Sequence, residues 1–523
     1  MGGEPPLRSL TFSDFRPQAQ VKIQCAGGTI YDWSDIEPDI MSITLHRDVS
    51  GAAGAFGITL TAATDKNGKT WLDRINPMDY IEIRAANLGA TAASLNPNGP
   101  FLGGSPGVMP MRFRGFVDSV AYTITIGPSG GPERAVLVQG RDYTKLFMVS
   151  NIQYLWTSSA IAAGMAAAQY GLTFNYNLPW QINTVKDFVH GVIDTVFNGA
   201  GSAIPQWSAQ QITSSAQAAS GETGIQGPAG YGGGGGQAFL PAFREGGVHV
   251  PNIQISCSVP DKYSIVSLAV QPYTGPFWNL LTYFQSPPLG ECFVYDNEDG
   301  PVLVYRVTPL KDIDGYFIPP AQDPGATRLQ LGHIFSNTDF NSGRMVAKSD
   351  NEVVNYVFVF SDVGATDGGS SAAYVSSSLM AQNFSVYATQ SSQSLSTRTN
   401  PYWNADSTRK FGLRPLNIVS PWVPFLSPSG DYQELATELA YFAGKAYDHN
   451  EKLYSGTITC HGDSLFIPGR YIGFTDNATG DKWSFYLESV TDTFNFKPMP
   501  EPSWNCELGL TRGYITSSYA PAQ

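Results

Sequence analysis

Charged side chains are scarce in this sequence, and positive ones are the scarcer. Asp, Glu, Lys and Arg make up 14% of the 523 residues, whereas about 25% is usual in soluble proteins. Lys and Arg number 31 against 44 Asp and Glu, for a net charge of −13. Because nucleic acids are bound by clustered Lys and Arg, this composition argues against a nucleic-acid-binding protein. Low charge also favours a subunit of an assembly, with a large β-rich monomer as the alternative.

Cysteine is also rare, and long apolar runs are missing. The five cysteines are odd in number, widely spaced and without a CxxC pair, which predicts neither a disulfide framework nor a zinc ribbon. We expect Cys460 and Cys506 to be small core residues, and a reducing compartment for folding. No apolar run approaches the length of a membrane helix, and the N-terminal region lacks the apolar core of a signal peptide. The sequence therefore predicts no membrane anchor.

Sequence motifs of the common catalytic sites are missing as well. There is no GxSxG, HExxH or Walker A pattern. An acidic cluster at Asp296, Glu298 and Asp299 lacks the ligand spacing of an EF-hand, and we interpret it as a solvated turn. A facing carboxylate pair of a glycosidase could be hidden among the acidic residues. The six histidines are scattered and form no HxH pair: His46, His190, His249, His333, His449 and His461.

We accordingly predict no catalytic, cofactor-binding or metal-binding residues, and a protein that is not an enzyme. No cofactor is expected. Two functions stay open as alternatives, namely a cell-wall or polysaccharide hydrolase and a receptor-binding protein. The first would need a carboxylate pair or metal site, and the second would need exposed aromatic or loop-tip surfaces.

What the sequence does contain is short segments of alternating apolar and polar residues, separated by turn residues. Gly numbers 54 and Pro 36, and a Gly-, Pro- and Asn-rich stretch at 87–110 predicts a surface loop. Spacing of this kind is typical of a small β-barrel or sandwich. The expected strands near the N-terminus are 19–25, 40–47, 56–61, 80–85, 111–126 and 135–139.

The C-terminal end combines a helix with a second strand series. Residues 432–453 carry Leu435, Leu439 and Phe442 on one helical face, and Asp431 with Glu434 predicts an N-terminal capping box. The expected strands that follow are 454–460, 470–475, 482–496 and 505–511.

The middle of the chain changes period. We expect a β-hairpin from 291–295 and 302–306 and low-complexity excursions at 199–247 and 361–378. Helices are predicted over 142–149, 158–170, 183–197 and 274–285, and a strand over 355–360. The predicted domains are 1–150, an N-terminal β-barrel; 151–330, an α/β domain with the Gly-rich insertion 199–247; 331–430, a mixed β domain with a loop insertion; and 431–523, a helix plus a second β-barrel.

The two strand series resemble each other. Residues 77–83 match 468–474, and 117–126 match 487–496 in the same order; 137–139 could then correspond to 508–510. The longer spacing in the N-terminal copy is accounted for by the loop at 87–110. Alternating strands can look alike by chance, but the ordered spacing favours two copies of one barrel. The expected fold is therefore a β-rich, multidomain α+β protein with two related small β-barrels near the two ends and α/β domains between them.

A further set of segments follows in a fixed order along the chain: the end of the N-terminal strand series at 138–142, the segments 277–281, 290–296, 302–306 and 411–414, and the closing helix with its strands. Together they resemble a family of phage tail baseplate hub proteins, the late control protein D type of contractile tails. The insertions at 87–110, 199–247 and 361–400 depart from compact members of that family.

This resemblance implies a homotrimer in which two barrels per chain make a ring of six. Such a ring would join a six-fold tail tube, or distal tail tube protein, to a three-fold central spike protein, with tape-measure and wedge proteins as further partners. It also implies a virion protein of the tail baseplate, assembled in the host cytoplasm. DNA would only pass through the channel, which the acidic charge suits.

Overall fold

Most of the predicted strands and helices fall in the part of the chain that the computed structural model describes. The predicted helix 158–170, the capping residue Asp431, most of the loops at 87–110 and 199–247, and all but the first residue of 361–378 lie outside it. The described residues are 17–51, 53–87, 109–126, 132–152, 154–155, 175–176, 184–198, 240, 243–244, 247–263, 275–308, 334–336, 340–348, 350, 353–361, 401–423, 432–447, 449–464, 466–475, 480–496 and 502–515.

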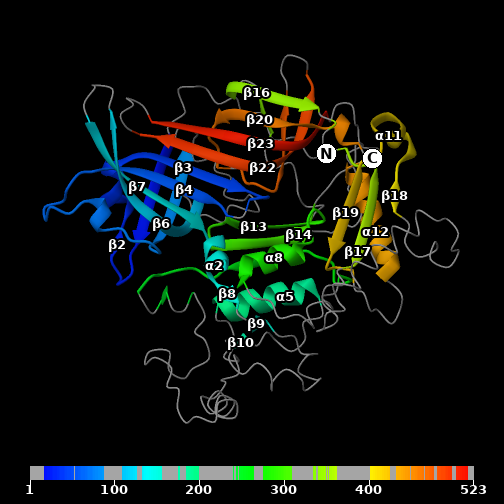
Figure 1. Ribbon diagram of the computed structural model, residues 1–523. Helices are drawn as coiled ribbons and strands as arrows, with labels where there is room; N and C mark the ends of the chain where they lie inside the picture. The colour runs from blue at the N-terminus through cyan, green and yellow to red at the C-terminus, as the bar shows by residue number, and fades with distance from the viewer. Residues whose placement is uncertain are drawn as a thin grey trace, which may run out of the picture.

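A large antiparallel sheet dominates the molecule (Figure 1). One half of it, the N-terminal strand set, has the order β3-β4-β7-β6-β5-β1, and every neighbouring pair is antiparallel. All six predicted N-terminal strands are confirmed. The bounds are β1 (Pro17–Gln24), β3 (Ile40–Asp48), β4 (Ala55–Thr61), β5 (Tyr80–Asn87), β6 (Met111–Ile126) and β7 (Pro132–Asp142). A short strand, β2 (Ile30–Tyr31), pairs with β1, and α1 (Trp33–Ile36) follows it.

The other half, the C-terminal strand set, has the order β16-β20-β23-β22. Strand β21 pairs with the first part of β22, and β15 lies parallel to β21. The four predicted C-terminal strands are confirmed. The bounds are β15 (Ile334–Ser336), β16 (Phe340–Lys348), β20 (Tyr454–His461), β21 (Tyr471–Thr475), β22 (Lys482–Asn495) and β23 (Ser503–Ile515).

The two strand sets meet where β22 pairs with β3, so they form one 13-stranded sheet. Among the described strands no pairing closes either set into a barrel, and the two predicted barrels are therefore two sets of one sheet. The physical reason is the length of β22. Strand β21 covers only residues 482–486 of it, which leaves the second part free to pair with β3. Apolar side chains of both sets share a single core, in which Ile43, Val138, Phe494 and Leu508 are each fully buried.

A smaller layer of sheet and helices packs beneath the large sheet. The predicted hairpin is confirmed as β13 (Gly290–Asp296) and β14 (Pro301–Val307), and β11 (Gln254–Cys257) extends it parallel to β14. Figure 1 shows this hairpin between the large sheet and the helices. The helices are α2 (Thr144–Val149), α5 (Val185–Val192) and α8 (Phe277–Gln285), and α5 continues as a π-helical turn (Ile193–Asn198). Four strands of two residues each form two small pairs: β8 (Asn151–Ile152) with β12 (Gly275–Pro276), and β9 (Tyr154–Leu155) with β10 (Asn175–Tyr176).

The long helix α12 (Tyr432–Tyr447) packs on a third sheet. Its predicted apolar face is confirmed, since Leu439, Phe442 and Ala443 are fully buried. It lies against β17 and β18 rather than leading into the C-terminal strands. That sheet consists of β17 (Tyr356–Ser361), β18 (Tyr402–Trp403) and β19 (Pro415–Ser420), with a short unpredicted helix, α11 (Ala405–Phe411), between the last two.

The two cysteines that were predicted to lie in the core are buried. Cys460 and Cys506 are 1% and 0% exposed and lie directly opposite each other in β20 and β23, which confirms them as core residues.

Within the described residues, no helix is both long enough and apolar enough to cross a membrane.

Replacing Leu439 by Ala should lower the free energy of unfolding of the α12 region by about 2–5 kcal/mol, because a fully buried side chain leaves a cavity. Thermal melting followed by circular dichroism measures the effect. The matched control is Tyr441→Ala on the same helix, since Tyr441 is 52% exposed. Equal losses in the two variants would contradict the packing of α12.

Candidate functional site

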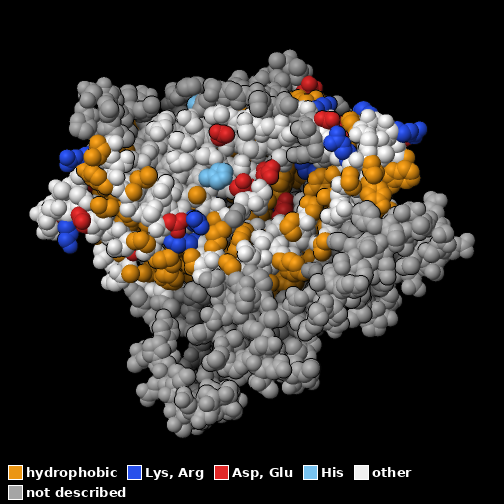
Figure 2. Space-filling model, viewed as in Figure 1, with side chains coloured by type: hydrophobic (Ala, Val, Ile, Leu, Met, Phe, Trp, Pro, Cys, Tyr) orange, Lys and Arg blue, Asp and Glu red, His pale blue; other side chains and the backbone are white. Residues whose placement is uncertain are grey.

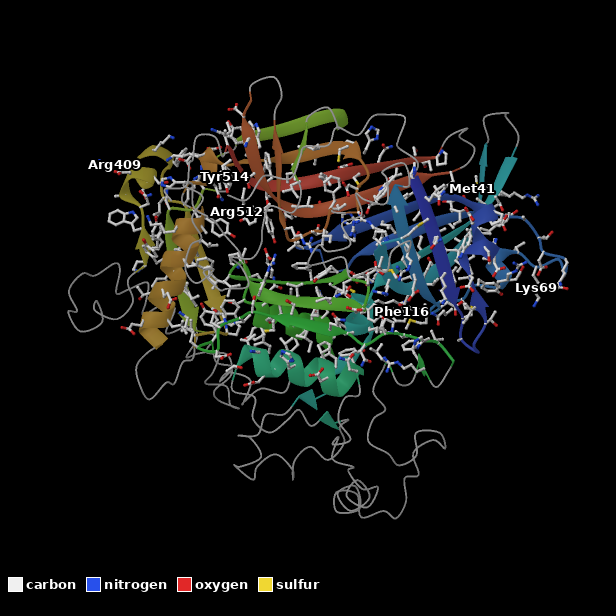
Figure 3. All side chains as sticks on the ribbon, turned by 180° about the vertical axis from the view of Figure 1, so that it is seen from behind. Met41, Lys69, Phe116, Arg409, Arg512 and Tyr514 are labelled. Carbon is white, nitrogen blue, oxygen red and sulfur yellow. The ribbon has the colours of Figure 1, made fainter. Side chains whose placement is uncertain are left out.

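The feature that sets this molecule apart is that the strand arrangement occurs twice. In the N-terminal set Tyr80 of β5 lies opposite Phe116 of β6, and in the C-terminal set Tyr471 of β21 lies opposite Tyr486 of β22. The aromatic rings of each pair are in contact, with centroids 5.7 Å and 5.3 Å apart respectively. Figure 3 labels Phe116, where β6 faces the hairpin layer. The first two sequence matches therefore occupy the same positions in the two sets.

A β-bulge recurs at the same place in both copies. The ladder between β6 and β7 shifts between Val117 and Ser119, and the ladder between β22 and β23 shifts between Leu487 and Ser489. A bulge adds one residue to one strand and increases the local twist. Its presence at matching positions argues that the two sets share a backbone design and not only an alternating pattern.

The turn before β5 and β21 is also repeated. Met78 and Gly469 have positive φ angles of 73° and 83°. The Met78 amide donates to the Val117 carbonyl at 2.7 Å, and the Gly469 amide donates to the Leu487 carbonyl at 2.8 Å. In return Val117 and Leu487 donate their amides to the residues that follow each turn. A non-glycine residue with positive φ is uncommon, so this shared turn is strong evidence for a duplication.

The remaining strands extend the correspondence. Ile58 of β4 lies opposite Val138, and Ile458 of β20 lies opposite Leu508. Strand β16 then takes the place of β3, because Arg344 lies opposite Ile458 as Ile43 lies opposite Ile58. Each of these ladders has a register shift near its start, at 40–42 and 340–342.

Two details differ from the repeat expected from the sequence. Val138 corresponds to Leu508, so residues 137–139 match 507–509, and the predicted match to 508–510 is wrong by one residue. A slip of one residue exchanges the two faces of a strand. The outermost strands also differ, since β1 is antiparallel to β5 whereas β15 is parallel to β21.

A buried carboxylate holds the two sets together. Oδ2 of Asp492 in β22 accepts hydrogen bonds from Arg47 of β3 at 2.7 Å and from Arg112 of β6 at 2.8 Å. On Oδ1 it accepts from the Trp504 indole at 2.9 Å and from the Cys506 thiol at 2.7 Å. Because the Asp492 side chain is 0% exposed, each of these four donors is tied to one position in the sheet.

The charges at this junction shift one another's protonation equilibria. Burial alone would raise the pKa of Asp492, but Arg112 and Arg47 outweigh it and lower the pKa below the ordinary 3.8. Burial and the nearby Arg112 charge lower the pKa of Arg47 to about 10. At neutral pH Asp492 and Arg47 are therefore both charged, and the one carboxylate is shared by two guanidinium groups.

The hairpin of β13 and β14 contacts the C-terminal set through a second buried network. Glu291 accepts from the Tyr486 hydroxyl at 2.6 Å and from Arg306 Nε at 2.9 Å. Arg306 also donates through Nη2 to the Gly469 carbonyl at 2.7 Å, which anchors the repeated turn.

The other end of the same hairpin contacts the N-terminal set, which corrects the prediction of a solvated turn. The Asp296 side chain is only 4% exposed and accepts from the Arg114 amide at 2.8 Å. Burial raises the pKa of Asp296 to about 6, against the opposing effect of the Arg114 charge. Glu298 pairs with Arg84 at 2.7 Å and accepts from the Met111 amide. Only Asp299 of the three is exposed. The acidic residues serve as anchors on β5 and β6, and their partners lie about two hundred positions away, where no local pattern could reveal them.

The histidines lie on separate elements. His46 is in β3 with Nδ1 2.9 Å from the Thr491 hydroxyl, His190 is in α5 and His461 in β20. His333 lies outside the described residues. Across the described part of the chain no three His, Cys, Asp or Glu side chains come together as a metal site would require.

Replacing Asp492 by Asn should lower the free energy of unfolding by about 3–5 kcal/mol, because two buried guanidinium groups lose their counter-charge. Since the folded pKa is lowered, the stabilisation is present above the unfolded pKa and is lost as pH falls through the folded value. The difference in melting temperature between wild type and variant should thus be constant from pH 5 to pH 8 and shrink only below about pH 4.

The control for that experiment is Asp406→Asn, which removes an exposed pair with Arg409 and should cost almost nothing. A difference for Asp492 that changes steadily between pH 5 and pH 8 would contradict the shared-carboxylate junction.

The repeated turn offers a test in two matched positions. Gly469→Ala should destabilise the protein, since its φ is positive and a Cβ would lie 2.5 Å from the Phe293 ring. Met78→Gly should cost less than Gly469→Ala at the equivalent position, because glycine relieves the left-handed strain and so offsets part of the lost packing of the partly buried Met78 side chain. Melting temperatures measure both, and a loss at Met78 equal to that at Gly469 would argue against equivalent turns.

Comparisons with known proteins do not establish a family for this chain. Neither family models nor curated proteins give a match. Among solved structures, the chain is similar to a tail protein from Neisseria meningitidis (TM-score 0.41, 11% identity, 95% of this chain and 97% of that one). It is also similar to the 43 kDa tail protein of prophage MuSo2 from Shewanella oneidensis (0.44, 11%, 94% and 98%) and to prophage tail protein gp18 from Listeria monocytogenes (0.37, 6%, 94% and 94%). All three TM-scores are below 0.5. We therefore infer the role of this chain from its own strand arrangement.

Proposed function

We propose that this chain is a structural subunit of a phage tail baseplate, a hub that forms a homotrimer and adapts six-fold to three-fold symmetry. The observation that carries the proposal is the duplicated strand set, with equal strand order, register, bulge and left-handed turn. Three copies of a chain that offers two equivalent surfaces can imitate a ring of six. The sequence resemblance to late control protein D-type hubs supplies the tail context.

In this proposal each strand set provides one of the six related surfaces of the ring. The six-fold face meets the tail tube or distal tail tube protein, and the three-fold face meets the central spike protein. Tape-measure and wedge proteins are further partners, and the protein resides in the virion after assembly in the host cytoplasm. The net charge of −13 favours a channel through which DNA passes without binding.

The mechanism is mechanical and involves no chemical step. The Asp492 junction fixes the angle and register between the two sets, and the hairpin of β13 and β14 braces each set from below. A symmetry adaptor needs such rigidity, because a mobile joint between its two surfaces would not hold six positions in a ring. The ends of the hairpin bind the two sets through different residues, which makes the two surfaces related but not identical.

The purified full chain should be a trimer, with a mass three times the 56.5 kDa of one chain, alone or with a co-expressed spike protein. Size-exclusion chromatography with light scattering over a range of concentrations measures it. Incubation with purified peptidoglycan should release no soluble fragments. A stable monomer under all these conditions would refute the hub, and a monomer that degrades peptidoglycan would point to the hydrolase interpretation instead.

A further inference from the structure

The second half of β6 has an open edge at the place where β22 is covered. In the C-terminal set, β23 lies on one side of β22, and residues 489–495 pair with β3 on the other. The corresponding residues of β6, 119–125, pair with β7 on one side. Strand β5 reaches only as far as Phe116, so among the described strands nothing lies on the other side. An open strand edge offers unpaired backbone groups to another chain.

Two large hydrophobic side chains on this open edge are exposed, although such side chains are usually covered. Tyr122 and Ile124 are 43% and 60% exposed. Their counterparts in β22 are Asp492 and Phe494, and both are 0% exposed. Phe494 lies directly opposite Ile43 of β3 and stacks on Trp504 of β23, so β3, the neighbouring strand that β6 lacks, is one of the elements that cover it. Figure 2 shows hydrophobic side chains on the surface at the end of the molecule where β6 and β7 project in Figure 1.

The complementary edge is at the opposite end of the sheet. Strand β16 is the counterpart of β3, since each pairs with the equivalent strand, β20 or β4. Both ladders shift register near their start, at 340–342 and 40–42, and β16 has a second shift at 342–344. Strand β3 has neighbours on both sides, whereas β16 is the terminal strand of the described sheet, with β20 beside it. Counting the described strands only, each chain thus has one open edge on the counterpart of β22 and one on the counterpart of β3.

We infer that the open edge of β6 in one copy pairs antiparallel with β16 of a second copy and repeats the β22–β3 junction between chains. Transferring that register places Ile124 opposite Arg344, Thr123 opposite Met345 and Tyr122 opposite Val346 of the other chain. The inference rests on the proposed trimer and names the surface that builds it.

The arrangement is head to tail, so it must either close into a ring or continue as a filament. A closed ring of three chains would contain six strand sets and would alternate between three intrachain and three interchain junctions. Strands β6 and β16 are far apart in the strand order of one chain, so any direct link between them joins two molecules.

A cysteine pair tests the register. The double variant Tyr122→Cys with Val346→Cys should form interchain disulfides on mild oxidation, because directly opposed Cα atoms in antiparallel strands lie about 4.5–5.5 Å apart, within disulfide range. A non-reducing gel should show a covalent ladder that ends at three chains and collapses with dithiothreitol. Mixing the two single variants should give covalent species of two chains at most.

Two controls make the result specific. Tyr122→Cys with Met345→Cys is out of register by one residue, so its side chains should point to opposite faces and cross-link at least ten-fold more slowly. The wild type under the same oxidation accounts for the native cysteines. Equal cross-linking of both double variants would overturn the proposed register.

An edge-blocking variant separates this inference from the trimer itself. Ile124→Glu should weaken self-association at least ten-fold with an unchanged melting temperature of the monomer, because its side chain is exposed in one chain. The matched control, Leu72→Glu, changes a residue that is 41% exposed elsewhere and should leave association unchanged. A trimer by light scattering that neither cross-links through 122 and 346 nor responds to Ile124→Glu would overturn the β6–β16 contact and leave the hub standing. A wild-type monomer would overturn both.

Discussion

One buried carboxylate, Asp492, constrains how the two halves of the large sheet fit together. It lies between two guanidinium groups that come from different strands of the N-terminal set, and each would be left without a counter-charge if the strands slipped. Separating buried ions is far more costly than losing a surface pair. The junction between β22 and β3 is therefore confined to one register, and the relation between the two strand sets follows from it.

The duplicated frame carries different side chains where the hairpin layer touches it. Glu291 and Arg306 bind Tyr486 and the turn at Gly469 in one set, whereas Asp296 and Glu298 bind Arg114 and Arg84 in the other. A single asymmetric hairpin cannot make the same contacts with two related surfaces. This asymmetry also explains why Gly469 lies against Phe293, while Met78 tolerates a side chain at the equivalent turn.

The low content of charged residues is consistent with a protein that works as part of an assembly. Several of the few charged residues, such as Arg47, Arg112 and Asp492, are buried and form ion pairs with one another. At the open edge of β6, apolar side chains such as Ile124 are exposed. A surface of this kind suits an assembled subunit better than an isolated molecule.

The sequence by itself determined the local elements. Alternation located β6 at 111–126, helical spacing located the buried face of α12, and two of three repeat segments were aligned correctly, because each depends on neighbours within a few residues. It could not align the third segment, recognise the role of Asp296 and Glu298, or show that the strand sets join in one sheet. Those features were decided by tertiary structure. They depend on contacts such as Arg114 with Asp296 or Asp492 with Arg47, between residues hundreds of positions apart, and only a folded backbone brings such residues together.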